Sequence, residues 1–154
     1  MMDRELNKKP LIVMVDDSET DLDLNLYAIR KLKIGVEVKE FRNGHEALDF
    51  MRETIAVGRI PSLLVLDLKM PQISGYDVLA LMQETGMKNF PIVVMSGSSL
   101  LEDIDRAKEL GADDYYEKPI DLTKTYHLFK RICSRYLSEP NMVQAQQFPL
   151  AKTG

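Results

Sequence analysis

Five short strand-like runs, each followed by a segment with helical periodicity, constrain the fold of this chain more than any other feature. The runs are LIVMV (11–15), VEVKEF (36–41), LLVLD (63–67), PIVVMS (91–96) and DYYE (114–117). A short apolar run with β-branched residues is typical of a buried strand, and an alternating run is typical of a half-exposed one. Strands that alternate with helices form a parallel sheet with helices on both faces.

The predicted helices run from about Asp21 to Gly35 and over residues 45–56, 76–85, 100–110 and 121–137. Their apolar residues recur at intervals of three or four positions. The first, third and fourth strands are continuously apolar, so we expect them at the centre of the sheet. Right-handed crossovers then predict the strand order 2-1-3-4-5, a doubly wound, flavodoxin-like α/β fold.

A chain of 154 residues fits one domain, predicted over residues 10–138. Residues 1–9 are expected to be an N-terminal extension, and residues 139–154 a C-terminal tail without periodicity. So short a tail cannot form a DNA-binding or enzyme module, so a stand-alone domain is expected. The net charge of -4 argues against DNA binding. The polar N-terminus is not expected to be a signal peptide, and no apolar run approaches the roughly 20 residues that cross a bilayer. One cysteine, Cys133, cannot form an internal disulfide, and a cytoplasmic location is expected.

Chemically active side chains collect at the carboxyl ends of the predicted strands, which is where such sheets bind ligands. Asp16 and Asp17 follow the first strand and Asp67 ends the third. Ser96 ends the fourth strand, and Lys118 follows the fifth. Carboxylates held close together repel one another, and a hard divalent cation such as Mg²⁺ (or Mn²⁺) relieves that repulsion. The sequence therefore predicts an acidic metal site.

Other readings of this edge are weaker. Asp17 or Ser18 could merely cap the first helix. A nucleotide or flavin site needs a glycine-rich loop after the first strand, but that loop is the acidic DDSETD (16–21). A haloacid dehalogenase-type hydrolase would need Asp-x-Asp after its first strand. Here Asp67-Leu68-Lys69 follows the third strand and lacks the second aspartate. A cation site beside one nucleophilic carboxylate, with a hydroxyl and an amine nearby, favours chemistry through an aspartyl phosphate.

Four motifs in order resemble the CheY-like receiver domains of two-component response regulators. They are VDDSETD (15–21), VLDLKMPQISGYD (65–77), VVMSGSS (93–99) and GADDYYEKPI (111–120). The resemblance covers about residues 10–138. It implies a receiver fold that is phosphorylated on an aspartate and is not a turnover enzyme.

The resemblance also implies a role for each residue at this edge. The implied roles are Asp67 as phosphoacceptor, Asp16, Asp17, Asp67 and the Lys69 backbone carbonyl as Mg²⁺ ligands, Lys118 as partner of the phosphoryl group, Ser96 and Tyr115 as the switch pair, and a cis peptide bond before Pro119. Spacing to the lysine favours Tyr115 over Tyr116 as the switch aromatic. Ser98 and Lys69 either tune the lifetime of the aspartyl phosphate or are simply solvated loop residues.

The family's mechanism implies a phosphoryl donor and a downstream partner. The donor would be a sensor histidine kinase or a histidine phosphotransfer protein, and some stand-alone receivers of this type pair with phytochrome-type kinases in bacteria. Phosphorylation would change the surface of the fourth helix, fifth strand and last helix, which an unknown protein target reads and which could also form a homodimer. The alternative is a phosphorylation-independent adaptor. A phosphatase is disfavoured because no separate general base is visible near Asp67.

Overall fold

The structure is a computed structural model that describes residues 8–137, which form five strands and five helices in strict alternation. The strands are β1 (Leu11–Val15), β2 (Glu37–Phe41), β3 (Leu63–Leu66), β4 (Ile92–Ser96) and β5 (Asp114–Glu117); the helices are α2 (Glu19–Lys31), α3 (Gly44–Ala56), α4 (Gly75–Glu84), α5 (Leu101–Glu109) and α6 (Leu122–Tyr136). All strand pairs are parallel and the order is β2-β1-β3-β4-β5. The predicted doubly wound fold and strand order are confirmed.

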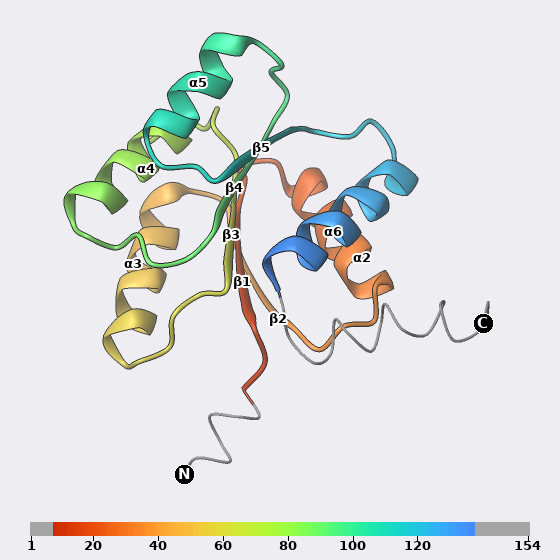
Figure 1. The fold of residues 1–154 in the computed structure, drawn as a ribbon, viewed down its shortest axis with the longest axis horizontal. Helices are drawn as coiled ribbons and strands as arrows, with labels where there is room; N and C mark the ends of the chain where they lie inside the picture. Colours follow the sequence, from red (N-terminus) through yellow and green to blue (C-terminus); the bar gives the residue numbers. More distant parts are fainter. Residues whose placement is uncertain (1–7, 138–154) are drawn as a thin grey trace.

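Helices cover both faces of the sheet (Figure 1). Helices α3, α4 and α5 lie on one face, and α2 and α6 lie together on the other. Successive strand residues point to opposite faces. In β1, Val13 and Val15 therefore pack with the first group of helices, and Ile12 and Met14 pack with the second. The molecule has two hydrophobic cores separated by one sheet.

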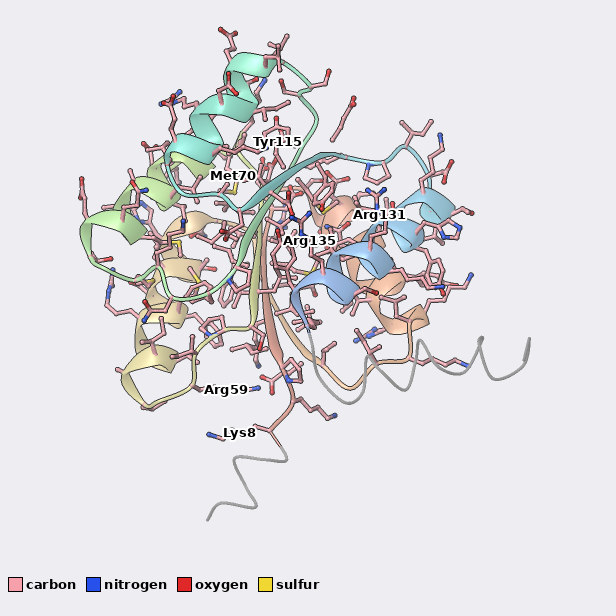
Figure 2. All side chains as sticks on the ribbon, in the orientation of Figure 1. Lys8, Arg59, Met70, Tyr115, Arg131 and Arg135 are labelled. Atoms are coloured by element: carbon pink, nitrogen blue, oxygen red, sulfur yellow. The ribbon has the colours of Figure 1, made fainter. Side chains whose placement is uncertain are left out.

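Burial follows the predicted position of each strand. Every residue of β1, β3 and β4 is buried, whereas β2 and β5 at the two edges are partly exposed. In β5, Tyr115 packs against the core under α3–α5 and Tyr116 against the core under α2 and α6. Figure 2 shows the same division, with Tyr115 on the α5 side of the sheet and Arg131 and Arg135 along α6. The two neighbouring tyrosines thus serve opposite faces.

Side chains with oxygen acceptors set where four of the five helices begin. Ser18 accepts a hydrogen bond from the N–H of Asp21 at 3.2 Å, so α2 begins at Glu19, two residues earlier than predicted. Ser18, rather than Asp17, is the cap. Ser74 and Asp77 form a reciprocal capping box at the start of α4. Since α2 follows β1 and α4 follows β3, the capped first turns of both helices lie on the carboxyl side of the sheet.

Gly75 lets α4 begin directly against the end of β3. A Cβ atom at this position would lie 2.2 Å from the backbone oxygen of Asp67 and 2.7 Å from the Cα of Leu68. The Gly75 N–H donates to the Leu68 carbonyl at 2.8 Å, which closes the intervening loop. Only a residue without a side chain fits here, because the atoms it would meet are backbone.

The predicted domain limits are only partly within view. Residues 1–7 of the predicted N-terminal extension and the predicted tail (139–154) lie outside the described residues. Within residues 8–137, no helix combines the length and apolar character needed to cross a bilayer.

Candidate functional site

Sheet-like backbone hydrogen bonds extend beyond the strand ends and include the polar residues of the predicted site. The Asp16 N–H donates to the Phe41 carbonyl at 3.0 Å, and the Asp67 N–H donates to the Val15 carbonyl at 2.9 Å. The Lys118 N–H likewise donates to the backbone carbonyl of Ser96 at 2.8 Å. Side chains that are distant in sequence are thereby held at one edge by sheet-like hydrogen bonds.

Three carboxylates converge at this edge as predicted. Each of Asp16, Asp17 and Asp67 offers an oxygen, and these oxygens lie within 4.8 Å of one another in the described part of the chain. Asp16 and Asp67 are each only 4% exposed. An all-oxygen donor set of this size suits one hard divalent cation that keeps some of its waters. The backbone carbonyl of Lys69 remains a predicted ligand.

Burial and repulsion between neighbouring carboxylates raise the pKa values of Asp16 and Asp67. Burial, and then the charge of Asp16, raise the pKa of Asp67 to about 6 although Lys118 opposes the change. Burial also raises the pKa of Asp16, against hydrogen bonds from Ser18 and Lys118. A bound cation would favour the ionised forms, so the site is electrostatically prepared for one.

Lys118 is the counter-charge of the site. Its Nζ lies 2.8 Å from Asp21, 2.9 Å from Asp16 and 3.4 Å from Asp67. Burial alone would lower the pKa of Lys118, but the hydrogen bonds to Asp21 and Asp16 and the charge of Asp67 together raise it. The ammonium therefore stays protonated throughout the physiological range.

Asp21 is the residue of this site that the sequence did not single out. It stands in the first turn of α2, five positions after Asp16, and its carboxylate lies 2.8 Å from the lysine Nζ. Its membership of the DDSETD loop was the available signal.

The cis peptide bond before Pro119 is a wrong prediction. No cis peptide bond occurs within residues 8–137, so the Lys118–Pro119 bond is trans. The lysine side chain reaches three carboxylates from this trans backbone, and orienting it requires no second isomer.

The two predicted switch residues, Ser96 and Tyr115, lie beside the loop between β4 and α5. Ser96 is fully buried at the end of β4, and its Oγ accepts a hydrogen bond from the Ser98 N–H at 3.2 Å. The half-buried Tyr115 donates its hydroxyl to the Ser98 carbonyl at 2.7 Å. Tyr115 is thus turned toward the loop between β4 and α5.

A doubly wound parallel sheet with an acidic triad and a lysine at its carboxyl edge defines a phosphoryl-accepting signalling module. The family model described as response regulator receiver domain matches residues 12–130, and the chain belongs to this family. It is therefore a CheY-like receiver of two-component signalling, phosphorylated on an aspartate, rather than a turnover enzyme.

Relatives of known kind agree with this assignment. The chain is 30% identical over 129 residues to the two-component response regulator ORR5 of Oryza sativa subsp. japonica, covering 83% of this chain and 89% of that protein. The phosphorylated cyanobacterial phytochrome response regulator RcpA superimposes with a TM-score of 0.76 at 30% identity, covering 85% and 96% of the two chains. The Mn²⁺-bound form of response regulator Rcp1 superimposes with a TM-score of 0.73 at 28% identity, covering 84% of this chain and 95% of that one.

Proposed function

We propose that Asp67 accepts a phosphoryl group from a histidine kinase or a histidine phosphotransfer protein, supported by a divalent cation that is normally Mg²⁺. The observation that carries this proposal is the meeting of three carboxylates and one ammonium at the carboxyl edge. The manganese-bound relative supports the choice of a hard divalent cation. The similarity to phytochrome response regulators makes a phytochrome-type kinase the first donor to test.

The contacts of the two buried carboxylates favour Asp67 over Asp16 as the nucleophile. Asp16 is engaged at both oxygens, by the Ser18 N–H at 3.0 Å and by Lys118 at 2.9 Å. Asp67 contacts Lys118 through Oδ1 at a longer distance, 3.4 Å. Its second oxygen is the better candidate to attack an incoming phosphorus.

Transfer exchanges one bond for another. An Asp67 oxygen attacks the phosphorus of a phosphohistidine, the P–N bond breaks with its electron pair returning to the imidazole, and a P–O bond forms. Lys118 donates to an oxygen of the moving phosphoryl group and offsets its charge. Asp16, Asp17 and Asp67 would hold the Mg²⁺ ion, which would supply further neutralisation of the charge on the phosphoryl oxygens.

The new anion is read through the switch pair. Ser96 donates its hydroxyl to the phosphoryl group, which favours the position of Tyr115 beside the loop that its hydrogen bond to the Ser98 carbonyl already provides. The α5–β5–α6 surface then changes, and a downstream protein or a second copy of the chain binds it. The added charge acts by biasing a two-state element.

Intact mass after incubation with acetyl phosphate and Mg²⁺ tests the proposal. Wild type should gain one phosphoryl adduct, whereas the Asp67→Asn variant and a chelator control should gain none. A variant at the exposed carboxylate Asp105, Asp105→Asn, should behave as wild type. If neither acetyl phosphate nor a phosphorylated kinase modifies a protein that still binds Mg²⁺, the adaptor alternative replaces the phosphoacceptor.

A further inference from the structure

Every hydrogen-bonding group of Ser98 is engaged, which makes it the central residue of the β4–α5 loop. Its N–H donates to Ser96 Oγ at 3.2 Å, and its carbonyl accepts from the Tyr115 hydroxyl at 2.7 Å. Its own hydroxyl donates to Asp103 Oδ2 at 2.5 Å and accepts from the Leu100 N–H at 3.2 Å. Both switch residues therefore contact Ser98 directly.

Asp103 ties this loop to helix α4. One of its oxygens accepts from Ser98, and the other accepts from the Tyr76 hydroxyl at 2.9 Å. Tyr76 is only 8% exposed, and the guanidinium of Arg106 stacks 4.0 Å from its ring centroid. The hydrogen bonds from Ser98 and Tyr76 lower the pKa of Asp103, while burial and the bond to Asp103 raise the pKa of Tyr76 to about 12. The carboxylate is thus a charged acceptor for two hydroxyls from two different elements.

We infer that Asp103 is a positioning residue for the switch: by holding Ser98 it presents the Ser98 carbonyl to Tyr115 and keeps that ring turned inward. Asp103 contacts none of the reacting groups of the acidic site, so it acts only through Ser98. Its role in signalling rests on the proposed function. The hold on the loop itself rests on the hydrogen bonds alone.

The arrangement also leaves Ser96 ready for its own role. A serine hydroxyl has one donor and two acceptor positions. Because the Ser98 N–H occupies an acceptor position of Ser96 Oγ, the Ser96 proton remains available for an oxygen of the phosphoryl group. Holding Ser98 in place therefore serves both members of the switch pair.

A purely structural role for Asp103 must be separated from this one. Asp103 lies in the first turn of α5, where any acidic residue is favourable toward the helix dipole, and the N-cap residue Leu100 makes no side-chain cap bond. Glu102 is the matched control, since it stands in the same turn, is exposed, and makes no hydrogen bond to Ser98 in the described residues. Both Asp103→Ala and Glu102→Ala remove one first-turn charge, but only Asp103→Ala releases the loop.

The experiment measures how exposed the Tyr115 ring is to solvent. The protein is labelled with fluorotyrosine, the Tyr115 fluorine signal is assigned with Tyr115→Phe, and its relaxation is followed as a soluble paramagnetic agent is added. We expect at least about a threefold larger enhancement in Asp103→Ala than in wild type, since bonds to a charged acceptor are among the stronger ones. Glu102→Ala should match wild type. Tyr76→Phe should give an intermediate increase that adds nothing when combined with Asp103→Ala, because the two groups share one bond.

The same samples are taken through urea unfolding and the acetyl phosphate reaction. Equal Tyr115 exposure in Asp103→Ala and Glu102→Ala would overturn the inference. It would also be overturned if the increase in Tyr115 exposure were proportional, in both variants, to the loss of unfolding free energy. Failure of wild type to form the adduct would defeat the proposed function instead. A selective rise in exposure with adduct yield unchanged is the result we expect.

Discussion

Removing the charge of the proposed phosphoacceptor should make the metal-free protein more stable. Asp67 is buried beside Asp16, and its pKa is raised to about 6 from an ordinary value of 3.8. The folded protein therefore holds this proton more tightly than the unfolded chain does. At neutral pH the folded state must carry an ionised carboxylate that its surroundings disfavour, and Asp67→Asn removes that cost.

The size and sign of the effect follow from the two pKa values. A pKa of about 6 in place of 3.8 corresponds to about 3 kcal/mol of destabilisation above the folded pKa. Between these values the folded state binds more protons than the unfolded state, so this contribution to stability falls as pH rises from about 4 to about 6. Asp67→Asn should thus raise the free energy of unfolding by about 2 to 3 kcal/mol near pH 7.5, and this increase should disappear near pH 4.

Urea unfolding with a chelator present, at several pH values, measures this difference. Asp105→Asn is the control at an exposed carboxylate and should change stability by less than about 0.5 kcal/mol. Excess Mg²⁺ should stabilise wild type far more than Asp67→Asn, so the difference between their free energies of unfolding should become smaller. A variant no more stable than wild type near pH 7.5, or a gain that persists unchanged at pH 4, would refute the reasoning.

Three further outcomes can be measured on the same protein. Gly75→Ala should lower the free energy of unfolding in urea by about 1 to 3 kcal/mol and reduce the phosphoryl adduct, because the new Cβ meets backbone atoms. Gly97→Ala should be nearly neutral, because a Cβ there meets no heavy atom within 4 Å. Asp21→Asn should slow adduct formation about threefold to tenfold by weakening the hold on the site lysine, and Asp23→Asn, on the exposed side of α2, should leave the rate unchanged. Cys133, whose pKa burial raises to about 12, should resist iodoacetamide at about pH 8 until the protein unfolds; modification of the native protein, read by intact mass, would contradict this.

The chain order of strands and helices was enough to predict the fold and the location of the acidic site. The apolar run of 63–67 ends in a carboxylate because β3 delivers Asp67 to the open edge of the sheet. Right-handed crossovers then leave one arrangement in which the ends of β1, β3, β4 and β5 meet. These features depend on backbone periodicity, which a single sequence carries.

Contacts between side chains of different elements could not be predicted in this way. Asp21 reads as an ordinary first-turn helix residue until α2 is placed beside Lys118. The bonds among Ser98, Asp103 and Tyr76 depend on how α4 and α5 approach one another and on the rotamers of three residues. Periodicity contains neither kind of information.

The neighbouring tyrosines of β5 make the length of that strand as important as its composition. Because side chains alternate with a period of two, inserting or deleting one residue between Ala112 and Tyr115 would exchange the faces served by Tyr115 and Tyr116. Such a protein could retain its sheet and its acidic site and yet send the wrong ring toward the loop. If Tyr115 has the proposed switch role, an odd change in spacing would abolish the output, whereas many substitutions at fixed spacing would only weaken it.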